Sequence, residues 1–250
     1  MFIPSLGLII VLVYFIFKNI APQISVQMRT VLIGILVVGC GVRTILRNRD
    51  WVDNETIYRV TARDCQNSVR AQTKLARSMY DEAILPQNAA LKSKYLADGM
   101  AVIDHSLKIY EKFALTHYVR GLMFKEQKRY QDAINALGRA VQLNPSSSTY
   151  PMQAGLCYGY LGQDSLAMLQ FKLAEAKGSV SPITFHELAR LYYNRGEYKT
   201  AINYYLQVLS INALDVRALT QVTKIYRDNL NDMTKARIYN ERLMKANNGK

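Results

Sequence analysis

Histidine, cysteine and acidic side chains are the groups in this chain that could catalyse a reaction or bind a metal. Their spacing does not match a known catalytic or metal-binding pattern. The three histidines, His105, His117 and His186, stand alone on predicted helices, and we interpret them as packing or surface residues. The sequence has no glycine-rich phosphate loop, HExxH, CxxC or nucleophile-elbow pattern. We therefore predict no catalytic residue, no cofactor site and no metal site.

The cysteines and the acidic residues near the N-terminal third lead to the same interpretation. The cysteines form an odd set without metal-ligand spacing or a disulfide framework: Cys40, Cys65 and Cys157. Four carboxylates follow one another closely enough to suggest a metal or acid–base site: Asp50, Asp53, Glu55 and Asp64. Helix capping and charge balance against neighbouring arginines explain these carboxylates more simply.

A regular pattern of small and large residues organises the second half of the chain. The stretch from Ala114 to Pro145 is predicted to form two helices, with a turn near Gln127–Arg129. Pro145 ends the second helix because proline has no N–H to donate. Small residues allow the two helices to approach closely, and large residues fill the space around them. The small residues are Gly121, Ala133 and Ala140, and the large ones are Phe124, Tyr130 and Leu137.

The same pattern returns twice at intervals of about 34 residues, which is the signature of the tetratricopeptide repeat (TPR). The second copy contains Gly155, Tyr158, Gly162, Ala167, Phe171 and Ala174. The third contains Leu188, Ala189, Tyr192, Gly196, Tyr198, Ala201 and Tyr205. One helix pair cannot bury its apolar face alone, so neighbouring pairs stack into a solenoid. We predict an all-α chain in which residues 69–250 form a right-handed TPR α-solenoid.

The expected repeats cover residues 69–113, 114–147, 148–181 and 182–215, followed by a terminal cap at 216–250. The first repeat requires an insertion of about 11 residues around Ile84–Lys94, in the turn between its helices. The terminal unit is one residue out of step, and its polar tail suits a solvated end. Residues 47–68 are expected to hold a junction and a half-repeat capping helix at Asp53–Asp64, with Asp53 or Asn54 as its N-cap.

Two apolar runs precede the repeats. Phe2–Phe17 contains no charged residue, and Val31–Val42 follows after the short linker Asn19–Thr30. A membrane helix needs about 20 apolar residues, so we predict that residues 1–46 form a two-helix membrane hairpin in contact with lipid. A signal peptide is the competing interpretation, but no basic stretch precedes the first run. Basic residues and Trp51 after the second run suit an interface anchor.

The order of these segments resembles a known family. An IPSLG-like opening at Ile3–Gly7 and a second apolar helix precede a junction motif, and the repeats follow it. The motif consists of Arg43, Thr44, Arg47, Asn48, Arg49, Asp50, Trp51, Asp53, Asn54, Glu55, Thr56 and Tyr58. Over essentially the whole chain, this order resembles the C-terminal part of the transmembrane and tetratricopeptide repeat proteins (the TMTC family) and of their bacterial relatives.

The resemblance implies a polytopic O-mannosyltransferase-like enzyme that uses a lipid-phosphate sugar donor. The family's acidic catalytic residues lie upstream of anything present here, which implies a fragment or a truncated paralogue. The resemblance also implies an integral membrane protein of the bacterial inner membrane, or of the endoplasmic reticulum in a eukaryote. The repeats would then face the periplasm or lumen, although counting basic residues near the apolar runs favours the cytoplasm by a small margin.

We therefore expect a membrane-anchored TPR protein-interaction module, the C-terminal part of a mannosyltransferase-like protein whose catalytic part is missing here. The alternative is a stand-alone membrane-tethered scaffold for an envelope or membrane protein complex. The sequence leaves open whether the whole protein is an enzyme. The net charge is +13, but no groove-reading motif is present, so we expect no nucleic-acid partner. A protein or peptide is expected in the concave TPR face, lined by Tyr118, Leu122, Met152, Leu156, His186 and Arg190.

Overall fold

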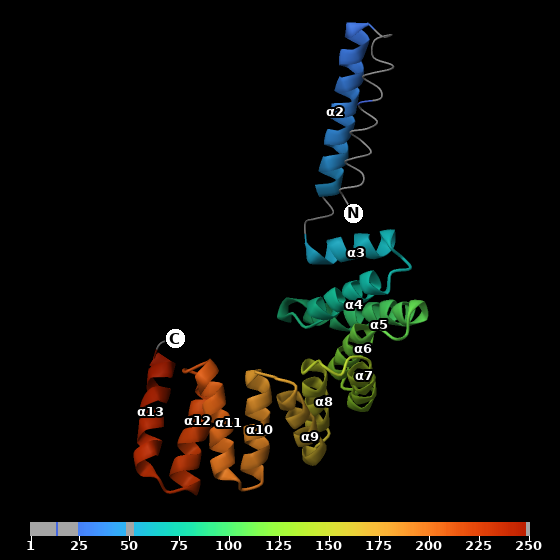
Figure 1. The fold of residues 1–250 in the computed structure, drawn as a ribbon. Coiled ribbons are helices and arrows are strands. Elements are labelled where there is room, and N and C mark those ends of the chain that lie inside the picture. Colours follow the sequence, from blue (N-terminus) through green and yellow to red (C-terminus); the bar gives the residue numbers. More distant parts are fainter. Residues whose placement is uncertain (1–13, 15–24, 49–52, 249–250) are drawn as a thin grey trace. The chain divides into compact units, whose positions relative to one another are not determined.

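The computed structural model describes Tyr14, residues 25–48 and residues 53–248, and these residues divide between two compact units. The first unit, Met1–Val60, contains α2 (Val26–Asn48) and the start of α3 (Asn54–Asp64) (Figure 1). Asp53 is the N-cap of α3, because its Oδ1 accepts a hydrogen bond of 2.6 Å from the Thr56 N–H. Within the described ranges the chain forms helices and turns and no strand.

The structure does not support the predicted membrane hairpin. Phe2–Phe17 lies outside the described residues apart from Tyr14, and Val31–Val42 lies within α2. Among the helices of the described ranges, none combines the length and the apolar character that a membrane crossing requires. The predicted interface anchor at Trp51 also lies outside the described residues.

The second unit, Thr61–Lys250, is a stack of helix pairs. Each helix contacts its pair partner, and each pair contacts the next pair along the chain. The pairs are α4 (Val69–Ala83) with α5 (Lys92–Ile109), α6 (Ala114–Glu126) with α7 (Tyr130–Leu143), α8 (Thr149–Tyr160) with α9 (Asp164–Ala176), α10 (Pro182–Asn194) with α11 (Tyr198–Ile211), and α12 (Val216–Lys224) with α13 (Met233–Asn248). Contacts between neighbours in sequence make this unit a helical solenoid, as predicted.

Glycines mark the points where the two helices of a repeat touch. A Cβ atom on Gly121 would lie 2.7 Å from Leu137 Cγ, and one on Gly155 would lie 2.9 Å from the Phe171 ring. At contacts this short a Cβ atom would force the facing side chain to shift, so both positions favour glycine. The predicted small residues on the second helices, Ala133, Ala140, Ala167, Ala174 and Ala201, have no exposed surface.

The turns inside successive repeats share one backbone conformation. Lys128, Gly162 and Gly196 occupy the same place in three repeats and have φ values of 61°, 71° and 77°. After each of them, the next N–H bonds to a carbonyl five residues earlier, as from Gln163 to Tyr158 at 2.9 Å. This is the hydrogen bond that closes a helix whose last residue is left-handed.

The first and last repeats depart from the regular pattern. Between α4 and α5, where the insertion is expected, lies the 3-10 helix η4 (Pro86–Leu91). Between α12 and α13 lies η5 (Ile225–Asn229), a π-helical turn in which the Leu230 N–H bonds to the Ile225 carbonyl at 3.1 Å. A π turn accommodates one additional residue in a helix.

A cluster of buried hydroxyl groups joins the first three helices of the solenoid. Thr73 Oγ1 of α4 lies 3.0 Å from Ser106 Oγ of α5 and 2.7 Å from Thr116 Oγ1 of α6. None of the three side chains is exposed to solvent. Hydroxyls satisfy one another here because each can both donate and accept.

Candidate binding surface

The first helices of successive repeats contact one another through polar side chains. Lys125 Nζ of α6 donates a hydrogen bond of 2.9 Å to Gln153 Oε1 of α8. The Lys224 Nζ atom of α12 lies 5.8 Å from the centre of the Tyr193 ring of α10, a cation–π contact. We define the first-helix face by the residues Lys125, Gln153, Leu156, Glu187, Arg190, Tyr193, Arg217 and Lys224.

Arginines surround a single carboxylate on the α10–α12 part of this face. Glu187 Oε2 accepts a hydrogen bond of 2.8 Å from Arg190 Nε, and Glu187 Oε1 lies 3.5 Å from Arg217 Nη2. Arg190 also lies 3.7 Å from Asp164 Oδ1 of α9. The Arg217 side chain is 61% exposed, so its contact with Glu187 is weak and solvent-screened.

Positive charge remains on this part of the first-helix face. In the described part of the chain, no carboxylate oxygen lies within 4.0 Å of Lys224 Nζ. Lys224 is therefore open to a negatively charged partner, and the exposed Arg217, which Glu187 contacts only weakly, can also reach one, while Glu187 holds Arg190 in place. Guanidinium groups bind carboxylates through paired N–H donors, so this geometry favours acidic ligands.

Aromatic side chains gather around Arg77 at the other end of the solenoid. The Arg77 guanidinium lies 5.3 Å from the centre of the Tyr80 ring and 5.9 Å from that of Tyr118. It also binds Asp81 at 3.0 Å, and the Tyr118 ring lies 4.9 Å from the ring of Tyr150. Burial raises the pKa of Tyr80 to about 12. These contacts bury the Tyr80 ring and join α4, α6 and α8.

The six residues predicted to contact a partner all lie on first helices, but most are covered. Tyr118, Leu122, Met152 and His186 are buried, whereas Leu156 and Arg190 are partly exposed. His186 Nε2 lies 3.2 Å from Asp215 Oδ1, and Asp215 is the N-cap of α12. His186 thus joins two neighbouring repeats. A binding role for these six residues stays a prediction.

Sequence reasoning missed four charged residues of the first-helix face: Lys125, Glu187, Arg217 and Lys224. The repeat period could have identified Lys224, which lies one period after Arg190 on the next first helix. The pairing of Glu187 with Arg217 has no such signal. It joins the sixth place of one repeat to the second place of the next, and only the stacking of α10 against α12 brings these places together.

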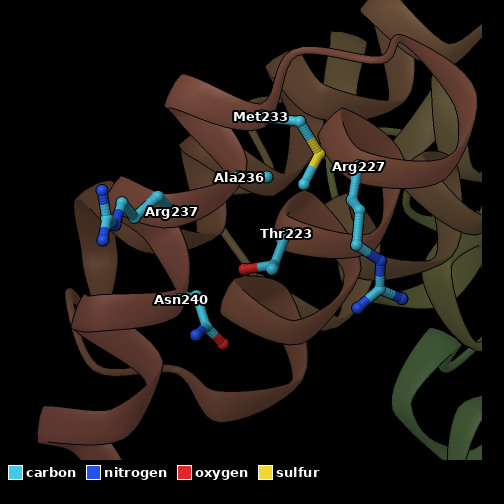
Figure 2. Close-up of a pocket in the computed structure, with 6 residues that line it drawn as sticks. All are labelled: Thr223, Arg227, Met233, Ala236, Arg237 and Asn240. Atoms are coloured by element: carbon cyan, nitrogen blue, oxygen red, sulfur yellow. The ribbon is translucent and has the colours of Figure 1, made fainter.

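A pocket of about 410 Å³ lies at the C-terminal end of the solenoid, between α12, η5 and α13. Figure 2 shows the residues that line it: Thr223, Arg227, Met233, Ala236, Arg237 and Asn240. The matching places one repeat earlier hold Ala189, Tyr193, Tyr198, Ala201, Ile202 and Tyr205. There, Ala189, Ala201 and Tyr205 belong to one core cluster with Leu219 of α12.

The pocket is therefore the end groove of the array, at the place that the next first helix fills in an internal repeat. Two arginines and an asparagine replace two tyrosines and an isoleucine, which suits a surface that faces solvent. Arg227 binds Asp228 through two contacts of 2.6 and 3.1 Å, so it is already paired. In the described ranges, no group of three or more His, Cys, Asp or Glu residues could hold a metal ion.

The fold and this surface define a class of protein, a solenoid of paired helices. The tetratricopeptide repeat family matches the chain twice, at residues 114–147 and at residues 184–215. A TPR repeat-containing protein of Methanocaldococcus jannaschii, MJ1428, is 20% identical over 157 residues. The match covers 62% of this chain and 28% of that protein, so the chain spans less than a third of the relative's length.

Solved structures agree with the family matches. PilF of Pseudomonas aeruginosa has a TM-score of 0.65 and 20% identity, over 85% of this chain and 91% of that one. MamA has a TM-score of 0.58 and 18% identity, over 66% of this chain and 96% of that one. YrrB, a TPR protein, has a TM-score of 0.58 and 13% identity, over 76% of this chain and 91% of that one.

This chain is a TPR repeat protein with an all-helical TPR solenoid. The comparisons do not show a relationship to the TMTC family, so the resemblance noted in the sequence stays a prediction.

Proposed function

We propose that the solenoid is a protein-interaction module that binds an acidic peptide segment on the α10–α12 part of the first-helix face. The observation that carries this proposal is the placement of Glu187 between Arg190 and Arg217, with Lys224 beyond them. Glu187 and Asp164 bring two negative charges to the three positive charges of Arg190, Arg217 and Lys224, so a positive charge remains and attracts negatively charged partners.

The peptide character of the partner has separate support. The structural relative YrrB is described as a TPR protein with an unusual peptide-binding site. On this chain, the half-buried ring of Tyr193 and the partly exposed Leu156 give apolar contact area beside the cations. A peptide that alternates acidic and apolar residues satisfies both features, whereas a small anion satisfies only the charge.

Fluorescence anisotropy with a labelled ten-residue peptide of alternating glutamate and leucine tests the proposal. The full chain should bind this peptide and should bind the matching glutamine–leucine peptide at least about 10-fold more weakly, since each lost ion pair weakens binding. The double variant Arg190→Glu/Arg217→Glu should lose at least about 10-fold in affinity. Raising the salt concentration should weaken wild-type binding, because mobile ions screen exposed charges.

The matched control is Arg195→Glu/Lys199→Glu, which changes the net charge equally. Arg195 and Lys199 are exposed in the turn after α10 and at the start of α11, away from the first-helix face. This control should bind the acidic peptide like the wild type. Equal binding of the two peptides, or equal losses in the two double variants, would refute a specific acidic-peptide site.

Two finer predictions from the sequence concern the whole protein. They are that the module belongs to a membrane-anchored mannosyltransferase-like protein, or that it is a stand-alone membrane-tethered scaffold. The TPR module accommodates both, since each uses the solenoid to hold a protein partner. The reading frame and protein mass in the source cells distinguish them, because the first requires upstream membrane helices with an acidic loop.

A further inference from the structure

The end groove between α12, η5 and α13 has a buried floor of small residues and an exposed, cationic rim. Thr223 and Ala236 form the floor and are 8% and 5% exposed. The rim residues are all exposed: Arg227, Met233, Arg237 and Asn240. Figure 2 shows Arg227 and Arg237 on opposite sides of Thr223, one from η5 and the other from α13. The groove therefore offers a cation on each side of a small-residue floor.

The previous repeat shows what kind of element fills a groove of this shape. There, helix α12 lies against α11, and its Leu219 belongs to one core cluster with Ala201 and Tyr205. Ala236 and Asn240 hold the places of these two residues in the end groove. The element that fits is therefore a helix that presents an apolar side chain to the floor.

The occupied groove also shows which residue of such a helix faces the rim. Lys224 Nζ of α12 lies 5.8 Å from the centre of the Tyr193 ring. In the end groove, Arg227 holds the place of Tyr193. A helix with a cation at the place of Lys224 would be repelled by Arg227, whereas a helix with a carboxylate there would gain an ion pair.

The charges around the end groove favour the same kind of helix. Residues 216–248 include seven basic and three acidic residues, a net charge of +4. In the described part of the chain, no carboxylate oxygen lies within 4.0 Å of the Arg237 guanidinium. Arg227 binds the exposed Asp228 through Nε and Nη2, which leaves Nη1 for another acceptor. Both rim arginines can therefore bind a carboxylate.

The first helices of this chain do not have the complementary charge. At the place of Lys224, helices α4, α6, α8 and α10 have Arg77, Leu122, Leu156 and Arg190. None of these residues is acidic, so none could form an ion pair with Arg227. A second copy of the chain that docked through one of these helices would leave Arg227 without a partner or repel it.

From these observations we infer that the end groove binds an amphipathic helix of another protein, in the place that α12 takes one repeat earlier. An apolar residue of that helix lies on the floor of Thr223 and Ala236, and acidic residues face Arg227 and Arg237. This site is separate from the α10–α12 part of the first-helix face and does not depend on the function proposed above.

Two labelled peptides test the inference by fluorescence anisotropy. Both have the sequence of residues 215–230, the segment that fills the previous groove, and the acidic peptide carries Arg217→Glu, Lys224→Glu and Arg227→Glu. The full chain is used with Arg190→Glu/Arg217→Glu, so that the first-helix face does not contribute. This chain should bind the acidic peptide at least about 10-fold more tightly than the natural-sequence peptide.

Reversing the charges of the rim should reverse this selectivity. Adding Arg227→Glu/Arg237→Glu should weaken binding of the acidic peptide at least about 10-fold and should strengthen binding of the natural-sequence peptide. The matched control adds Lys108→Glu/Lys112→Glu, two exposed residues of the first repeat, and should bind both peptides as before. Because all four residues are exposed, circular dichroism should show unchanged helix content.

Photo-cross-linking locates the bound peptide. An acidic peptide with benzoylphenylalanine at the place of Leu219 should label α13, because Leu219 lies in one cluster with Tyr205, at the place of Asn240. Equal binding of the two peptides, unchanged affinities after Arg227→Glu/Arg237→Glu, or labelling of α10 in place of α13 would overturn the inference.

Discussion

The rings of Tyr226 and Tyr239 stack with their centroids 5.7 Å apart and an angle of 14° between their planes. One repeat earlier, Tyr192 and Tyr204 stack in the same way, at 5.5 Å and 10°. The first members of the two pairs are 34 positions apart and the second members 35. The last repeat thus has one extra residue between its paired rings, and the π turn of η5 holds it without disturbing the stack.

Removing that extra residue should restore a regular repeat. Asn229 is the best choice, because its buried Oδ1 has no hydrogen-bond partner among the described atoms. Deleting Asn229 should raise the free energy of unfolding by about 1 kcal/mol, since a buried unpaired polar group is costly. Deleting Asn194, at the end of the regular helix α10, should instead lower it by more than about 2 kcal/mol. Urea unfolding of both variants measures the difference, and a destabilised Asn229 deletion would contradict the role of η5.

Replacing Lys128 with glycine should stabilise the chain. Lys128 has a φ of 61°, a left-handed conformation that costs a residue with a side chain about 1 kcal/mol. Glycine adopts this φ without strain, and Gly162 and Gly196 already do so at the same place. We expect Lys128→Gly to raise the thermal midpoint and Gly162→Lys to lower it. Equal effects of the two variants would mean that turn conformation does not limit stability.

Two glycines of neighbouring repeats should respond to alanine in opposite directions. A Cβ atom on Gly155 would lie 2.9 Å from the Phe171 ring, whereas one on Gly138 would meet nothing within 4 Å. Gly155→Ala should lower the free energy of unfolding by about 1–3 kcal/mol through overpacking. Gly138→Ala should raise it by about 1 kcal/mol, because alanine favours helix. Urea unfolding measures both, and a neutral Gly155→Ala would show that the two helices can move apart.

The three thiols should differ in reactivity at pH 8. Burial raises the pKa of the Cys157 thiol to about 11, whereas Cys40 and Cys65 are exposed. The thiolate is the reactive species, so Ellman's reagent should titrate two thiols quickly and the third slowly. Cys65→Ser should remove one fast equivalent, and Cys157→Ala should remove the slow phase. Three fast equivalents in the folded chain would contradict the burial of Cys157.

The same thiol makes stability depend on pH. An unfolded cysteine has a pKa of about 8.5, so the folded chain holds this proton more tightly than the unfolded chain does. Its contribution to stability is complete below about pH 8.5 and is lost as the pH rises towards 11. The difference in free energy of unfolding between wild type and Cys157→Ala should therefore narrow over this range. A constant difference would show that the thiol does not titrate between the two states.

The repeat fold could be predicted from the sequence alone. Small residues recur at a period of about 34, and close packing between helices is the reason that small residues are needed at those places. Gly121, Gly155 and the alanines that recur on the second helices therefore predicted the solenoid. The one-residue slip of the last repeat was also visible in the sequence. Composition alone pointed to membrane helices, which the described residues do not support, because an apolar run does not specify its surroundings.

Which side chains a partner can reach depends on how the repeats pack, and the sequence does not show this. Tyr118, Leu122, Met152 and His186 lie at predicted contact places but are buried among neighbouring helices. The grouping of Glu187 with Arg190 and Arg217 depends on how closely α10 and α12 stack. The repeat period in the sequence does not give the distance between two helices, so it could not predict this grouping. The exposure of Leu169 could not be predicted from the sequence either. The spacing of leucines shows that one face of a helix is apolar, but only the packing shows whether another element covers that face.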